Sequence, residues 1–171
     1  MLNLKNKHQN NLNPKGIYVK IFSKLEEIEI ALERIKERYL DLSQISILSK
    51  NLERFNDGDT VSTLVKVKPS LVGYWSSVYG VEQDIGFLNV PEIGTCFVLG
   101  PLAPVLLNIL EEGKILGEFE GGLNGVLLGF GAEKSRIAKY NAALKNDACL
   151  VVVRGTPEEL KSIAVILEKN T

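Results

Sequence analysis

The chain has 171 residues, of which 45% are hydrophobic and 24% charged, and its 20 basic side chains nearly balance its 21 acidic ones. This composition excludes an intrinsically disordered, collagen-like or disulfide-stapled protein. A formal net charge of −1 gives no overall attraction to nucleic-acid phosphates. We therefore expect a single domain over residues 16–171 with no nucleic-acid partner, and the order of its predicted elements indicates the α+β class.

Residues 1–15 are rich in Asn and Lys and contain no apolar block of the length that a secretory signal needs. We interpret them as a flexible N-terminal arm. Cys96 and Cys149 each lie in an apolar run, where a thiol usually behaves as a small buried hydrophobe. These features predict a reduced, cytoplasmic protein.

The first folded segment has the pattern of a strand, a helix and a second strand. Apolar side chains alternate over residues 17–22, which predicts a strand. Ser23 and Glu26 have the spacing of a capping box, and apolar residues then recur every three or four positions over residues 25–39. This pattern predicts an amphipathic helix, and residues 45–48 predict the second strand, which completes a β-α-β unit.

Residues around 51–90 are interpreted as an insertion that contains a short helix. Its uncharged part holds Tyr74, Trp75 and Tyr79, which are candidates for a ligand-binding or partner surface. The alternative is that these aromatic side chains belong to the core and only their polar tips reach water.

Residues 93–110 contain no charge, and eighteen such residues reach the length of a membrane span. Gly100 and Pro101 interrupt the run at a natural boundary between a strand and a helix. We therefore predict a buried strand over residues 95–99 and a helix over residues 101–112 rather than a bilayer helix, and we expect no membrane association.

Gly121, Gly125 and Gly129 recur at every fourth position. In a helix they would line one stripe without side chains, a glycine zipper, on which another backbone can pack closely. Each glycine costs a helix roughly 1 kcal/mol relative to alanine, so we expect this stripe to be a packing or interface surface. Neither GxGxxG nor GxxxxGK[ST] occurs there, which argues against a phosphate-binding loop.

The last forty residues carry clear helix and strand signals. We predict a helix over residues 132–146 and a strand over residues 148–153 that is covered on both sides. Thr156 and Glu159 then predict a capping box at the start of a final helix. Arg154 is either a surface arginine or an anion ligand at the start of that helix.

No chemical constellation is visible in the sequence. The only histidine, His8, lies in the N-terminal arm, and Cys96 and Cys149 do not have the spacing of a zinc site. Adjacent carboxylates occur at turns and helix ends, and a catalytic dyad would need the fold to bring two such groups together. We therefore predict no catalytic residues, no cofactor and no metal.

The order of the predicted elements suggests two β-α-β halves that form a ferredoxin-like antiparallel sheet with helices on one face and an extra C-terminal helix. Short glycine-based motifs also occur along residues 16–171. They are VPEIGT at residues 90–95, GPL at residues 100–102, the glycine-rich stretch at residues 121–131, Tyr140, and LVVV at residues 150–153. In these motifs the chain resembles the bacterial general stress protein-like family, whose members are also described as heat-induced stress proteins.

This resemblance implies a ferredoxin-like core and a link to stress responses, and it carries no catalytic residues. Many members have a long Gly/Ala-rich helical hairpin in the middle of the chain, whereas residues 51–90 are aromatic and polar here. This departure argues against a membrane role.

Two hypotheses for the function follow. The first is a non-enzymatic, stress-related protein that acts through protein-protein or self-association surfaces, as a homo-oligomer or with another protein as partner. The second is a sensor that holds a small molecule between the sheet and the aromatic insertion near Trp75.

Overall fold

The computed structural model describes residues 15–38, 40–50, 77, 79, 85–111 and 122–169. The strands are β1 (Gly16–Phe22), β2 (Ile45–Ser49), β3 (Ile85–Val90), β4 (Gly94–Leu99) and β5 (Cys149–Gly155). The α-helices are α1 (Leu25–Glu37), α3 (Leu102–Glu111), α4 (Gly122–Gly129), α5 (Ile137–Lys145) and α6 (Pro157–Glu168), with short 3₁₀ turns at Leu42–Gln44 and Lys134–Arg136.

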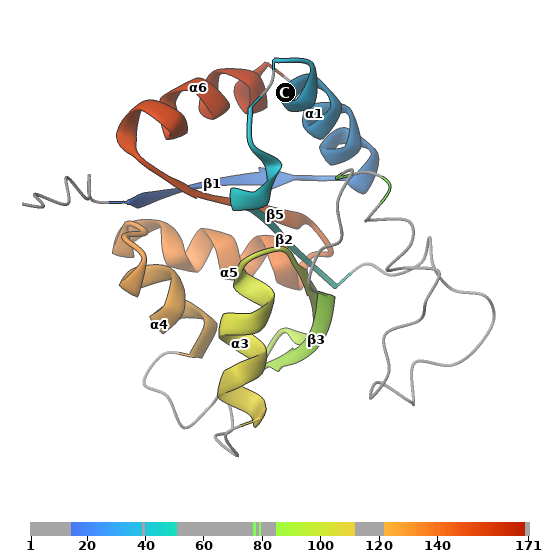
Figure 1. Ribbon diagram of the computed structural model, residues 1–171. Coiled ribbons are helices and arrows are strands. Elements are labelled where there is room, and N and C mark those ends of the chain that lie inside the picture. The colour runs from blue at the N-terminus through green and yellow to red at the C-terminus, as the bar shows by residue number, and fades with distance from the viewer. Residues whose placement is uncertain are drawn as a thin grey trace, which may run out of the picture.

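The five strands form one sheet in the order β1-β5-β2-β4-β3, and each neighbouring pair is antiparallel. The expected α+β class and antiparallel sheet are therefore confirmed. Since β1 and β2 both run antiparallel to β5, they run parallel to each other on either side of it. Helices α1 and α6 lie on one face of the sheet and α3, α4 and α5 on the other (Figure 1).

The expectation of helices on one face only, as in a ferredoxin-like fold, is wrong. The reason lies in β5. This strand lies between β1 and β2 in the sheet, and its residues 149–153 are all buried. Val151 and Val153 contact the α1 and α6 layer, while Leu150 and Val152 contact the opposite layer. Because successive side chains of a strand point to opposite faces, an apolar run of this kind needs cover on both sides.

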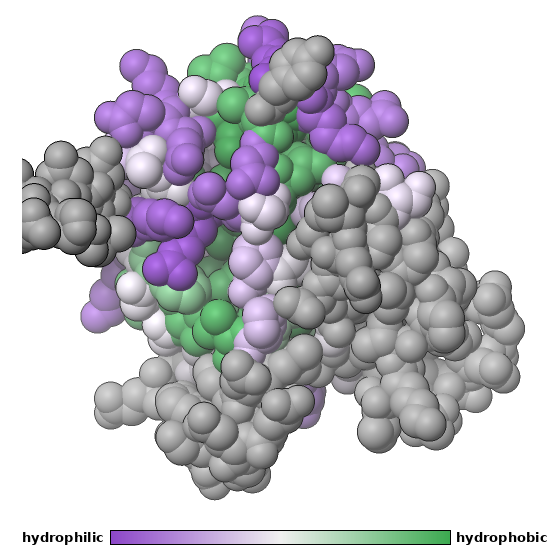
Figure 2. Space-filling view, in the orientation of Figure 1, coloured by the Kyte–Doolittle hydropathy of each residue, from purple (hydrophilic) through white to green (hydrophobic). Residues whose placement is uncertain are grey.

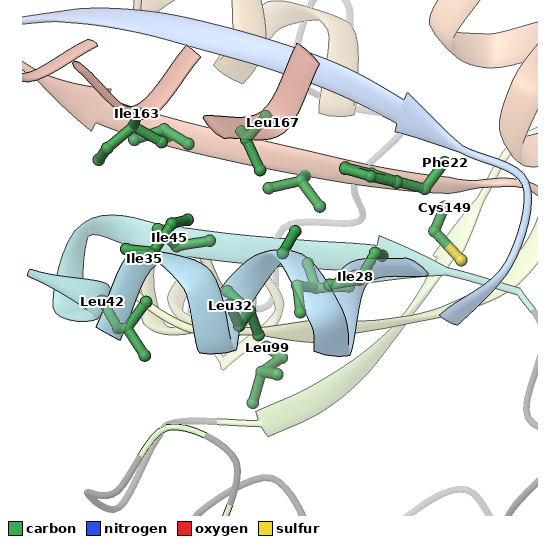
Figure 3. Close-up of a cluster of buried hydrophobic side chains, with 14 of the residues drawn as sticks. Phe22, Ile28, Leu32, Ile35, Leu42, Ile45, Leu99, Cys149, Ile163 and Leu167 are labelled. Carbon is green, nitrogen blue, oxygen red and sulfur yellow. The ribbon is translucent and has the colours of Figure 1, made fainter. Parts of the chain in front are cut away.

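Two separate cores result. The first lies between the sheet and α1 with α6, and it contains the largest buried side chains Phe22 and Phe97 (Figure 3). The second lies between the sheet and α3, α4 and α5, and Leu106, Leu127 and Leu144 from these helices are completely buried in it. The β-sheet is thus the middle layer of three.

The β1-α1-β2 segment matches its prediction except at the start of the helix. The N-cap of α1 is Lys24 rather than Ser23, and no side chain caps the helix, so the predicted capping box with Glu26 is wrong. Helix α1 nevertheless buries its apolar stripe, since the stripe packs against the sheet in the first core. The stripe consists of Leu25, Ile28, Ala31, Leu32 and Ile35.

Strand β3 was not predicted, because residues 85–90 were assigned to the insertion. The strand pairs with β4 along its whole length, from Ile85 opposite Leu99 to Val90 opposite Gly94. Part of the predicted insertion is therefore the outermost strand of the sheet. Residues 51–76 of the insertion and residues 1–14 of the N-terminal arm lie outside the described residues.

The uncharged run at residues 93–110 forms a strand and a helix, as predicted, with Gly100 at the boundary. Gly100 has a φ of +95°, and Ser46, buried in β2, accepts a hydrogen bond from the N–H of Leu102 at 3.0 Å. The start of α3 is therefore attached to β2. Among the described residues, no helix has the length and apolar character needed to cross a membrane.

The C-terminal helix starts as predicted. Thr156 is the N-cap of α6, its hydroxyl accepts from the N–H of Glu159, and the Glu159 carboxylate accepts from the N–H of Thr156 at 2.8 Å. Pro157 occupies the first turn, where a missing N–H has no consequence. This capping box fixes the direction in which α6 leaves the sheet and crosses β5 and β1.

Candidate functional site

The candidate surface is the outer face of α4, which we define by Gly125, Leu128 and Gly129. Positions i, i+3 and i+4 lie together on a helix, so these three residues share one face. The inner face of α4 holds Leu123 and Leu127, which are buried in the second core. Leu128 is 39% exposed, and the helix contains no charged residue. Figure 2 shows hydrophobic surface on the side of the molecule where α4 and α5 lie.

At the C-terminal end of the α4 outer face, the described residues leave space around Gly129. A Cβ added to Gly129 would meet nothing within 4 Å among the described residues. No described helix packs closely on the glycine stripe at Gly129, so its role as a packing or interface surface stays a prediction. Gly125 is half-buried and Gly121 lies outside the described residues.

A tight turn fixes the C-terminal end of α4. The N–H of Gly131 donates to the carbonyl of Leu128, and the N–H of Ala132 donates to that of Leu127, both at 3.0 Å. This pair of bonds is a Schellman motif, and Gly131 supplies the left-handed residue that it requires, with a φ of +103°. The turn therefore defines where α4 ends and where the chain leaves it.

Arg154 lies next to this turn. Its guanidinium carbon is 4.4 Å from the centre of the Phe130 ring, a cation–π contact. Arg154 is exposed and packs on Phe130, the residue that follows α4. This position agrees with the prediction that Arg154 is a surface arginine.

The three aromatic candidates from the insertion are not all described. Tyr79 is only 4% exposed, and its hydroxyl donates a hydrogen bond to the carbonyl oxygen of Ile45 at 3.0 Å. Tyr79 is therefore a core residue and not part of an exposed surface. Tyr74 and Trp75 lie outside the described residues, so their role stays a prediction.

Both cysteines are buried and reduced, and they lie on opposite faces of the sheet. Cys149 is opposite Ser49 and Ser49 is opposite Phe97, so these three side chains share the face of the first core. Cys96 is adjacent to Phe97 in β4 and therefore points into the second core. The sheet separates the two thiols, which excludes a disulfide between them in this fold.

Burial raises the pKa of the Cys96 thiol from 9.0 to about 11 and also raises the pKa of the Cys149 thiol. The neutral forms are therefore stabilised in the folded protein, and this contribution is complete below pH 9. As the pH rises from 9 to about 11, unfolded thiols ionise before folded ones, so the free energy of unfolding should fall. Urea unfolding across this range should show a shallower fall for Cys96→Ala than for the wild type. Equal slopes in the two proteins would contradict this assignment.

The described ionisable side chains form small separate clusters. Lys50 lies 3.5 Å from a carboxylate oxygen of Asp147 and donates to the carbonyl of Lys145. On the other face of the sheet, the Glu168 carboxylate of α6 accepts hydrogen bonds from the Tyr18 hydroxyl and the Lys20 ammonium of β1. Within the described parts of the chain, no group of three His, Cys, Asp or Glu has a geometry that could hold a metal ion.

No protein-family model matches this chain, and comparisons with curated proteins and with solved structures gave no match either. Its function therefore has to be inferred from its own residues and their geometry.

The sequence indicated the glycine stripe but missed Leu128, which gives the outer face of α4 its apolar character. The spacing of three from Gly125 to Leu128 was a usable signal. The Tyr18, Lys20 and Glu168 cluster was also missed. Glu168 is 150 residues from Tyr18 and 148 residues from Lys20 along the chain, so only the packing of α6 on β1 brings it to them.

Proposed function

We propose that this protein acts through self-association rather than catalysis, and that the outer face of α4 is the surface through which two copies bind. The observation that supports this proposal is the open space at Gly129 beside the exposed side chain of Leu128. A glycine-containing helix is intrinsically weak, and close approach of another backbone is the usual compensation.

A second copy of α4 has the matching chemistry. The helix carries no charge, so two such faces would meet without desolvating an ion. Glycines at positions 125 and 129 allow the two helix axes to approach closely, and Leu128 of each copy supplies apolar area to bury. A two-fold arrangement of this kind is the commonest form of homo-oligomer.

The link to stress responses rests on the resemblance of the glycine-based motifs to the general stress protein-like family. In this proposal the protein is a stress-related, non-enzymatic component whose activity depends on its association state.

The test is Gly129→Leu, measured by sedimentation velocity over a range of concentrations. The Cβ of a leucine at this position meets no described atom within 4 Å, and leucine favours the helix by up to about 1 kcal/mol relative to glycine. The melting temperature should therefore be unchanged or higher, while the association constant should fall at least about tenfold because the added side chain separates the two helices.

Leu128→Glu should also weaken association, and Ile30→Glu provides a matched control. Ile30 is 51% exposed on α1, on the opposite side of the sheet, so the same charge placed there should leave the association constant unchanged. A wild-type protein that stays monomeric at all concentrations would refute the proposal. Association that is insensitive to Gly129→Leu and Leu128→Glu would refute the α4 outer face as its site.

A further inference from the structure

Strand β1 is the last strand at one end of the sheet. All seven of its residues pair with β5, and no described strand pairs with its other side. An edge strand of this kind presents a row of backbone N–H and C=O groups that can pair with a strand of another chain. The sequence GIYVKIF increases this tendency, because it is rich in apolar and aromatic residues and contains a single charge.

That single charge is Lys20, in the interior of the strand. Its side chain is only 14% exposed, and its ammonium lies 3.0 Å from a carboxylate oxygen of Glu168 at the end of α6. The Tyr18 hydroxyl donates to the other oxygen of the same carboxylate. These two donors lower the pKa of Glu168, with the larger effect from Tyr18. We call Tyr18, Lys20 and Glu168 the edge cluster.

The edge cluster lies on the face of β1 that α6 partly covers. Tyr18 packs against the first core, and Lys20, two residues further along β1, points to the same side. The Glu168 side chain is 56% exposed, so water still reaches the ion pair. A strand added beside β1 would remove that water and leave the ammonium and carboxylate in a low-dielectric environment.

We infer that Lys20 protects the β1 edge against strand addition by a second copy of this chain. Removal of water from this ion pair opposes strand addition, because the two charges would lose solvation that new backbone hydrogen bonds do not replace. Buried or inward-pointing charges on edge strands are a known means by which natural sheets avoid edge-to-edge pairing. The edge cluster goes beyond the proposed function, because it concerns a different surface and disfavours association through the β1 edge of the sheet.

The test replaces Lys20 in the full-length protein with methionine, which has a similar length and no charge. Lys20→Met should form concentration-dependent species larger than the wild type in sedimentation velocity. Amide hydrogen exchange should slow at least about tenfold at alternate residues of β1, whose N–H groups point away from β5. Lys20→Gln, which is neutral but polar, should also form larger species and show slower exchange in β1. It replaces Lys20→Met in the test if the methionine variant folds poorly.

Two controls separate the charge from other effects. Lys161→Met makes the same chemical change at an exposed position of α6 and should behave as the wild type. Glu168→Gln removes the ion pair but keeps the Lys20 charge, so it should not associate through β1.

The inference would be overturned if neither neutral variant of Lys20 formed species larger than the wild type, or if such species formed without slower exchange in β1. It would also be overturned if Glu168→Gln formed the same larger species. Adding Gly129→Leu to Lys20→Met distinguishes this inference from the proposed function. Association through β1 should persist in the double variant even where the α4 contact is lost.

Discussion

Replacement of Gly100 by alanine should lower the free energy of unfolding by roughly 3 kcal/mol or more, the largest effect that we expect from a single methyl group in this protein. Two causes add together. The φ of +95° is strained for any residue with a side chain, and an added Cβ would lie only 2.3 Å from the carbonyl oxygen of Ile45. Because the obstacle is backbone of the central strand β2, it cannot rotate away as a side chain would.

Gly94→Ala is the matched control. Gly94 has a φ of +110°, but an added Cβ would meet nothing within 4 Å among the described residues. We expect Gly94→Ala to lower the free energy of unfolding only through backbone strain, by about 1 to 2 kcal/mol. Urea unfolding of both variants measures the difference. Equal losses would show that the contact between residue 100 and β2 is not as close as described.

Replacement of Tyr79 by alanine should lower the free energy of unfolding by about 3 to 5 kcal/mol, because the change leaves a large cavity in the first core. Tyr79 is 4% exposed and packs with Ile45 and its neighbours. If Tyr79 lined an open ligand site instead, the same replacement would lower the free energy of unfolding far less. Thermal or urea unfolding therefore separates the core role from the surface role that the sequence left open.

Tyr79→Phe is the control for the hydroxyl group. It keeps the packed ring and removes the hydrogen bond to the Ile45 carbonyl, so the loss should be about 0.5 to 1.5 kcal/mol. A loss for Tyr79→Ala that is no greater than that for Tyr79→Phe would contradict the burial of the ring. Tyr79 donates a hydrogen bond to the Ile45 carbonyl, and a Cβ added at Gly100 would collide with the same carbonyl, so the two sets of variants both test the packing around β2.

Local signals predicted most of the elements because the patterns that mark them, apolar periodicity and helix caps, span only a few residues. The capping box at Thr156 and Glu159 was predicted correctly, since Pro157 restricts the helix to one starting point. The similar spacing at Ser23 and Glu26 failed because Lys24 takes the N-cap position, which shifts the register by one residue. Such a spacing alone does not determine where a helix begins.

Strand β3 could not be predicted because its stability comes from pairing. Its sequence, IGFLNV, contains a glycine and an asparagine and lacks a clean alternation of apolar and polar residues. Hydrogen bonds to β4 define it as a strand, and those partners are known only from the tertiary structure. The assignment of residues 85–90 to an insertion followed from the same lack of a local signal.

The candidate site was predicted only in part. The spacing of Gly125 and Gly129 indicated a helix stripe, and α4 does contain both residues. Whether that stripe packs inside the molecule or faces outward depends on which helices surround it. The open space at Gly129 is a property of the assembled domain and has no counterpart in the spacing of the glycines.

The sequence by itself determined the elements of this protein whose causes lie within a few residues, namely apolar periodicity, helix caps and the glycine-proline break at residues 100 and 101. It also contained the sign that both faces of the sheet are covered, in the uninterrupted apolar run of β5. Only the tertiary structure decided the strand order, the cover of helices on both faces, and the contact between Lys20 and Glu168. These features depend on interactions between segments far apart in the chain, whose energies no local pattern contains.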